Sequence, residues 1–186
     1  MKEDIQEKYS RLRSSIKHGD VILFHGTEAL AKIIQESDSD AYFNHIGIVG
    51  EMSGVLFIVD SNAPGVHPER LSVRINRYAE SGGDFAIRRS KKTSEEIDTA
   101  FYNVMNTLEK EGEVKYDFVN GLKSLLNRRF KTKFKINPKE DRMICSMFVY
   151  PYLLELEMVR VFLFNNTLFF PQDAIRYGIN SLDITK

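Results

Sequence analysis

Three side chains that together could perform nucleophilic catalysis lie far apart in the sequence, at Cys145, His45 and Asp60. Cys145 is the only cysteine among 186 residues, so no disulfide can form within the chain. A histidine that accepts the proton of a thiol creates a strong nucleophile, and a carboxylate bonded to the imidazole fixes its tautomer and orientation. These residue types predict attack on a carbonyl group through a covalent intermediate, if the fold brings them together.

The position of Cys145 favours the reactive form of a thiol. The residue precedes an apolar segment that ends at Leu156, and this pattern predicts the first turn of a helix. Partial positive charge at a helix N-terminus stabilises a thiolate, which is the nucleophilic form. The alternative is a structural cysteine in the core, because free cysteines are among the most buried residue types.

His45 begins one apolar run and Asp60 ends the next, with a glycine-containing turn at 50–54 between them. This pattern predicts a β-hairpin in which Gly47 leaves room beside the imidazole. A four-residue loop would place His45 opposite Asp60, with Cβ atoms about 5 Å apart. A shift of one residue would turn Asp60 to the other face. The alternatives are a histidine bonded to backbone and an aspartate that starts a turn.

The elements that must position these residues follow from the spacing of apolar side chains. Recurrence every three or four residues predicts helices at 5–16, 27–34 and 94–108. Further helices are expected at 117–126, in the apolar segment 144–156, and from Pro171 until Gly178 closes the last one. Short apolar or alternating runs predict strands at 21–24, 45–49, 55–60, 71–75, 85–88 and 130–136. Ser94 is the expected cap of its helix. Pro151 predicts a kink or an early end in the helix that Cys145 begins.

Length and charge narrow the class of protein. The 26 basic and 26 acidic side chains balance, which argues against a protein that coats nucleic acid. We expect a single domain over 1–186, with 1–17 as an N-terminal helical extension. The apolar run from Met147 to Leu154 is far shorter than the ~20 residues of a membrane span, and no signal peptide is recognised at the N-terminus. We therefore expect a cytoplasmic protein.

His18, Asp20 and His25 lie within eight residues and have side chains that metals accept. Nothing near them supplies a further ligand at the spacing of a known metal motif. We expect neither a metal site nor a cofactor.

The strongest local charge lies between residues 128 and 135, where five of eight residues are basic and aromatic residues are interleaved. The alternation predicts a strand with one solvated face, or an edge strand protected by lysines. The functional alternative is contact with an anionic lipid head group, a cell-wall polymer or nucleic acid. The neutral chain favours the structural interpretation. The basic residues concerned are Arg128, Arg129, Lys131, Lys133 and Lys135.

Several short motifs, taken in order, resemble a known family. Residues 45–49 look like the histidine strand of NlpC-type cysteine peptidases, and 19–24 resemble the Gly-Asp and apolar strand of the same fold. His45 precedes Cys145 in this chain, an order similar to that of the circularly permuted papain-like amidases of the YiiX type. The resemblance runs from Gly19 to Gly178 and includes Pro64-Gly65-Val66, Tyr116-Asp117, Ile144-Cys145-Ser146 and Phe170-Pro171-Gln172-Asp173.

The resemblance implies an α+β fold of papain-like type, with a small antiparallel sheet or barrel packed against helices in permuted order. It also implies a cysteine hydrolase that cleaves an amide bond of a peptide or cell-wall type. Cys145 would be the nucleophile, His45 the base and Asp60 the orienting acid, with the backbone N–H of Cys145 as an oxyanion donor. The residues expected to contact substrate are Tyr116, Asp117, Pro171 and His25.

Two alternatives stay open. The same three residues could serve a thioesterase or acyltransferase that acts on lipid esters. The fold could also be a binding or structural module in which the site is closed. The expected partner is accordingly a peptide, a cell-wall fragment or a small acyl-containing substrate, and nucleic acid is not expected.

Overall fold

The computed structural model describes residues 3–27, 29–37, 41–62, 65–111, 115–136, 142–159, 169–176, 178 and 180–185. Within these residues eight strands form one sheet, in the order β7-β6-β4-β3-β2-β1-β5-β8. All neighbouring strands pair antiparallel except β6 and β7, which are parallel. The strands are β1 (Val21–His25), β2 (His45–Met52), β3 (Val55–Asn62), β4 (Gly65–Arg70), β5 (Asp84–Ser90), β6 (Lys115–Tyr116), β7 (Arg142–Met143) and β8 (Ser181–Asp183).

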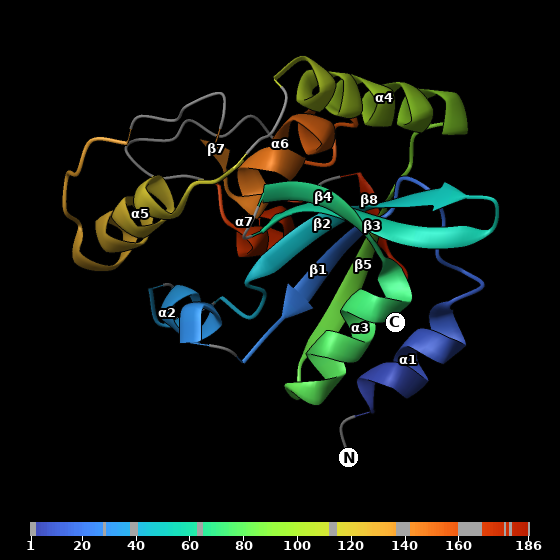
Figure 1. Ribbon diagram of the computed structural model, residues 1–186, viewed down its shortest axis with the longest axis horizontal. Helices are drawn as coiled ribbons and strands as arrows, with labels where there is room; N and C mark the ends of the chain where they lie inside the picture. The colour runs from blue at the N-terminus through green and yellow to red at the C-terminus, as the bar shows by residue number, and fades with distance from the viewer. Residues whose placement is uncertain are drawn as a thin grey trace.

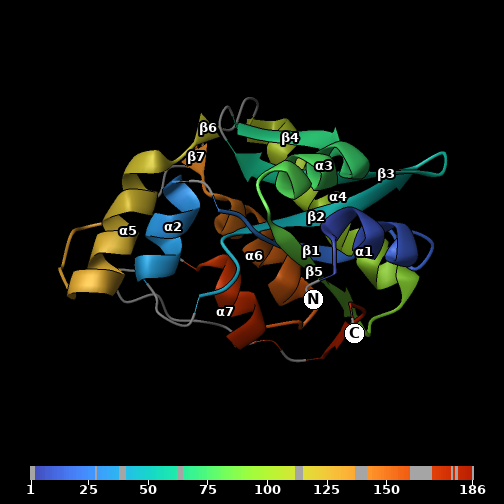
Figure 2. The ribbon, with the colours of Figure 1, turned by 90° about the horizontal axis from the view of Figure 1, so that it is seen from below.

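Helices cover both faces of this sheet, as Figures 1 and 2 show. One face carries α1 (Ile5–Leu12) and α3 (Leu71–Glu80), and the other carries α4 (Ser94–Glu111), α6 (Cys145–Glu155) and α7 (Pro171–Arg176). The remaining helices, α2 (Ala29–Ser37) and α5 (Phe118–Phe130), contact each other at one end of the molecule. This arrangement confirms the predicted α+β class. No helix in the described part of the chain is long and apolar enough to cross a membrane.

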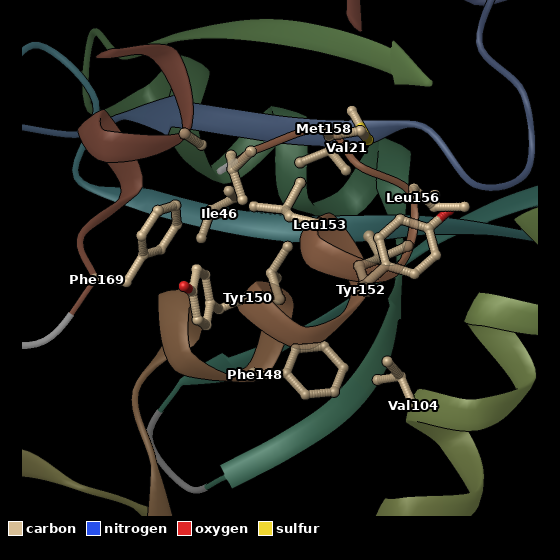
Figure 3. Packing of buried hydrophobic residues seen from close by; sticks show 14 of the residues in the cluster. Val21, Ile46, Val104, Phe148, Tyr150, Tyr152, Leu153, Leu156, Met158 and Phe169 are labelled. Atoms are coloured by element: carbon tan, nitrogen blue, oxygen red, sulfur yellow. The ribbon is translucent and has the colours of Figure 1, made fainter. Parts of the chain in front are cut away.

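Alternation along the central strands builds two cores. Val21 and Leu23 of β1 pack toward α6, whereas Ile22 and Phe24 pack toward α1 and α3. Figure 3 shows the core on the α6 side, where Tyr152 and its neighbours on α6 pack beneath the sheet. Because both faces of β1 are buried, its sequence reads as one continuous apolar run.

The hairpin of β2 and β3 is tighter than predicted. Met52 pairs with Val55, so the loop has two residues, Ser53 and Gly54, with φ of 51° and 76°. Two positive φ values match the twist of a two-residue hairpin turn. The predicted four-residue loop is therefore wrong, and the register moves by two residues. A shift of two preserves which face each side chain occupies, so His45 and Asp60 still share a face.

Two predicted strands are wrong. Residues 71–75 belong to α3, because Leu71 and Ile75 recur at helical spacing and pack into the core with α1. Residues 130–136 contain no strand, because α5 continues to Phe130 and ends at Lys131, whose φ is 52°. A left-handed residue at this position is a common way for a helix to end.

The predicted helices occur in the structure, with altered ends. α6 continues beyond Pro151 to Glu155, so the predicted early end is wrong. Thr93 caps α4, since its Oγ1 accepts the Glu96 N–H at 3.3 Å while Glu96 accepts the Thr93 N–H at 2.8 Å. The predicted cap, Ser94, is instead the first residue of this helix. Pro64 lies outside the described residues.

Candidate functional site

His45 and Asp60 meet on the face of the sheet covered by α3. The Nε2 atom of His45 lies 2.5 Å from Oδ2 of Asp60, and the carboxylate is fully buried. In the observed register Asp60 lies one step beyond the Ile48–Val59 pair, opposite Gly47 and diagonal to His45. A Cβ at Gly47 would lie 2.5 Å from Cδ1 of Ile58 and 3.0 Å from Cβ of Asp60, so the glycine leaves room for both of these side chains.

Arg74 holds Asp60 from the other side. Its Nη1 donates to Oδ2 at 2.5 Å and its Nη2 donates to Oδ1 at 3.2 Å. Asn62 adds a third donor, from Nδ2 to Oδ1 at 3.2 Å. Both oxygens of Asp60 are therefore satisfied although no water reaches them, which is the condition for keeping a buried carboxylate charged.

The network continues outward through alternating charges. Glu69 accepts from Nε of Arg74 at 2.6 Å, and its other oxygen accepts from Nη2 of Arg77 at 2.6 Å. Arg74 is only 3% exposed, whereas Arg77 is 54% exposed. The line of charges thus runs from solvent at Arg77 to the imidazole of His45.

Arg74 and Tyr78 are not among the predicted site residues, because the alternation at 71–75 predicts a strand there. A helix places Leu71, Arg74, Ile75 and Tyr78 on one face, since they recur at spacings of three, one and three. That face packs on the sheet, and the ring of Tyr78 stacks on Phe24 with centroids 4.3 Å apart. Helical spacing across the whole segment was the signal that could have identified both residues.

Charges around the pair set its protonation. Burial lowers the pKa of His45, but Tyr78, Cys145 and Asp60 together outweigh it and hold the pKa well above its ordinary value. For Asp60, burial raises the pKa, and the positive charges of His45 and Arg74 outweigh it, so the pKa of the carboxyl is lowered. The site therefore favours an imidazolium beside a carboxylate.

Cys145 is the first residue of α6, on the other side of the sheet from α3, and it packs in the core on that side. The residue is buried, and it is among the groups that raise the pKa of His45 and of Tyr78. Among the described hydrogen bonds none joins Sγ to the imidazole. The N-cap residue, Ile144, offers no side-chain hydrogen bond, so the first N–H groups of α6 lack a side-chain cap.

The segment before Cys145 is anchored on two sides. The carbonyl of Met143 accepts from Oγ of Ser61 at 2.7 Å and from the backbone N–H of Asp117 at 3.2 Å. Just after the cysteine, Oγ of Ser146 donates to the carbonyl of Phe169. These bonds fix the start of α6 relative to β3, the strand that carries Asp60.

Of the four residues predicted to contact substrate, the structure describes the side chains of Asp117, Pro171 and His25. Asp117 is the N-cap of α5, and its two oxygens accept from the backbone and side chain of Asn120. Pro171 begins α7 and is buried, and His25 ends β1 with its ring stacked on Tyr42. No described hydrogen bond joins these three to His45, Asp60 or Cys145. Tyr116 lies in β6, and its side chain is outside the described part of the structure.

Two other predicted clusters have structural partners. Asp20 accepts from Nε and Nη2 of Arg89, each at 2.7 Å, which occupies the carboxylate that a metal would need. Within the described ranges, no group of three or more His, Cys, Asp or Glu side chains could hold a metal ion. Arg128 pairs with the buried Asp173 at 2.8 Å, so it is not part of a free basic surface. The side chain of Arg129 is outside the described part.

Comparisons with known proteins give one informative result. No family model matches the chain, and no curated protein matches it. Among solved structures, the chain is similar to the crystal structure of the metalloprotein YiiX from Escherichia coli O157:H7, with a TM-score of 0.54 and 18% sequence identity. The similarity covers 76% of this chain and 67% of that chain. The chain thus has a YiiX-like fold.

Proposed function

We propose that this protein is a cysteine hydrolase that cleaves an amide bond through an acyl-enzyme on Cys145. His45 is the general base and acid, and Asp60 orients its imidazole. One observation supports the proposal: the buried Asp60, with both oxygens bonded, contacts Nε2 of His45 on β2, a strand that the helix begun by Cys145 packs against.

In the reactive state the proton of the thiol lies on Nδ1 of His45, the ring nitrogen that Asp60 does not engage, so a thiolate on Cys145 accompanies the imidazolium. The sulfur attacks the amide carbonyl, and the backbone N–H of Cys145 stabilises the oxygen as it becomes negative. The C–N bond then breaks, the amine leaves with the proton from His45, and a thioester remains on Cys145. Water, deprotonated by His45, attacks the thioester and releases the acid and the free thiol.

Asp60 and Arg74 supply orientation and charge in this mechanism. Because Arg74 neutralises part of the carboxylate charge, Asp60 stays ionised in its buried place. An ionised Asp60 keeps the imidazole in one orientation and stabilises the imidazolium that forms in each half-reaction.

We also propose that the fold is papain-like in permuted order. Its support is the chain order, in which His45 and Asp60 precede Cys145, together with the YiiX-like fold. YiiX is described as a metalloprotein. The donors here do not fit a metal beside His45, because the guanidinium of Arg74 lies 3.3 Å from Nε2 and on both oxygens of Asp60. No step is assigned to a metal.

A substrate panel tests the proposal and separates it from its alternatives. The full chain is incubated with peptide p-nitroanilides, cell-wall peptides, p-nitrophenyl esters of short and long acids, and acyl-CoA thioesters. The hydrolase proposal predicts cleavage of an amide that Cys145→Ser and His45→Ala abolish. Activity confined to long-chain esters or thioesters indicates the lipid thioesterase or acyltransferase instead. Full amide activity in Cys145→Ser contradicts the mechanism.

Thiol reactivity separates an enzyme from a closed binding module. Because Cys145 is the only cysteine, iodoacetamide reports on this thiol alone. The proposal predicts alkylation at neutral pH faster than that of free cysteine, and slower alkylation in His45→Ala. Alkylation no faster than free cysteine in both proteins supports the module.

A further inference from the structure

α5 presents its polar and apolar residues in the reverse of the usual order. Its inner side carries Asn120, Ser124 and Asn127, all buried. Its outer side carries Val119 and Leu122, which are 57% and 53% exposed. A surface helix of a globular protein ordinarily turns its apolar stripe to the core. The reversal means that internal packing does not account for the exposed apolar residues Val119 and Leu122.

The outer residues form one continuous stripe. Val119, Leu122, Leu126 and Phe130 recur at spacings of three, four and four, which places them on one face of the helix. Phe130, at the end of the stripe, is 65% exposed. Phe134 follows shortly after the helix and is also exposed, so aromatic surface continues beyond α5. In both ribbon views α5 lies at an end of the molecule, beside α2 (Figures 1 and 2).

Positive charge accompanies this apolar stripe. Residues 118–136 contain six basic residues and no acidic residue, although the whole chain is neutral. Lys131, Lys133 and Lys135 are exposed and alternate with Thr132 and Phe134. Arg128 does not contribute, because it is paired with Asp173 and lies over the ring of Phe170. Among the described side chains, the exposed positive charge is therefore concentrated just beyond the C-terminal end of α5, at these three lysines.

We propose that α5 and the segment to Ile136 bind the surface of an anionic lipid membrane. Apolar side chains on one side of a helix, with lysines beside them, are the features of a helix that lies in the membrane interface. The apolar stripe enters the boundary between head groups and acyl chains, while the lysines meet lipid phosphates. We call residues 118–136 the lipid-binding surface.

Two other occupants fit these features less well. A second copy of the chain would bring two sets of lysines together, and like charges across an interface oppose association. A nucleic acid would use the lysines, but it would leave the aliphatic part of the stripe, Val119 and Leu122, in water. An anionic lipid surface offers phosphates to the lysines and an apolar region to the aliphatic and aromatic side chains.

The lipid-binding surface connects directly to the candidate active site. Asp117, which caps α5, donates its backbone N–H to the carbonyl of Met143, two residues before Cys145. Binding through α5 would therefore hold the start of α6 close to the membrane. The proposal does not depend on hydrolase activity, because it concerns only the affinity of the chain for a lipid surface.

Sedimentation with vesicles tests the proposal on the full chain. The vesicles are phosphatidylcholine alone, or phosphatidylcholine with phosphatidylglycerol, at physiological salt. We expect binding to the anionic vesicles only. The triple change Lys131→Gln, Lys133→Gln and Lys135→Gln should lower the partition coefficient about a hundredfold, since each basic residue near an anionic surface contributes severalfold.

A second variant removes the apolar contribution. Leu122→Ser with Phe130→Ser should lower the partition coefficient at least tenfold, because two exposed apolar side chains no longer enter the interface. Tyr102→Ser is the matched control, because Tyr102 of α4 is 64% exposed and lies outside the lipid-binding surface. Circular dichroism verifies that each variant is folded, and the control should bind like the unchanged protein.

Four results would overturn the proposal. The first is no sedimentation with anionic vesicles, and the second is binding that both variant sets leave unchanged. The third is a dimer in light scattering that Phe130→Ser dissociates, which would assign the stripe to a second copy of the chain. The fourth is binding of a fluorescent oligonucleotide, lost with the lysines, in the absence of vesicle binding.

Discussion

Replacing Arg74 with methionine tests how the buried acid of the site is held. Methionine keeps an unbranched apolar stem but removes every donor of the guanidinium. Asp60 then loses contacts at 2.5 and 3.2 Å, and Glu69 loses one at 2.6 Å. Asp60 is fully buried, so water cannot replace what it loses.

The magnitude follows from these contacts. Hydrogen bonds to charged groups contribute about 1.5–3 kcal/mol each, and removing one partner of a buried pair costs about 3–5 kcal/mol in total. In a domain of this length each kcal/mol moves Tm by about 2–4 °C. Arg74→Met should therefore lower Tm by roughly 6–20 °C.

Thermal unfolding at pH 7, followed by circular dichroism, measures this loss. Arg77→Met is the matched control, since Arg77 bonds to Glu69 but not to Asp60 and is 54% exposed. An exposed pair of this kind contributes about 0–1 kcal/mol, so the control should lose only a few degrees.

The pH dependence of the stability lost in Arg74→Met is the result that can refute this reasoning. Because the folded pKa of Asp60 is lowered, its stabilising contribution is present above the ordinary carboxyl pKa of about 4 and is lost as pH falls through the folded value. The difference in stability between the unchanged protein and Arg74→Met should shrink in acid. Equal losses for Arg74→Met and Arg77→Met, or a difference that grows in acid, would refute the reasoning.

Three further predictions concern the site and its supports. Because the pKa of His45 is raised in the folded protein, its stabilising contribution is fully present below about pH 6.5 and is lost as pH rises through the folded value. Urea unfolding should therefore show that His45→Gln is most destabilising at low pH. A loss of stability in His45→Gln that grows with pH would contradict this. Gly47→Ala should cost about 1–3 kcal/mol and lower any activity, because the added Cβ clashes with Ile58 at 2.5 Å and crowds Asp60 at 3.0 Å. Gly82→Ala, with φ of 69° and no neighbour within 4 Å, should cost about 1 kcal/mol and keep the activity. Asp173→Asn breaks a buried ion pair and should lower the free energy of unfolding in urea by about 3 kcal/mol. The control Asp98→Asn, at an exposed aspartate, should lower it by at most about 1 kcal/mol. Similar losses in the two variants would show that the buried pair adds no stability.

Local sequence patterns located much of the site. The apolar run of β1, the glycine in the strand of His45, and the apolar segment after Cys145 each predicted an element that the structure contains. Their faces were also predictable, because alternation along a strand decides which side chains share a side. His45 and Asp60 therefore meet although the predicted loop was two residues too long.

What the local patterns missed depends on tertiary packing. Five residues from Leu71 to Ile75 alternate at period two, and only the wider segment reveals the helix that buries Arg74 against Asp60. The alternating lysines after Phe130 similarly predicted a strand. Among the described residues, no strand pairs with 131–136. A short alternating run cannot specify a strand without a neighbour to pair with.

Mass spectrometry of the intact protein during hydrolysis of p-nitrophenyl acetate tests the central claim most directly. The mechanism predicts a transient acetyl adduct, mapped to Cys145, that forms at least about a hundredfold more slowly in His45→Ala, as expected for loss of a general base. An adduct that never forms, or that forms equally fast in both proteins, would contradict a nucleophilic Cys145 activated by His45.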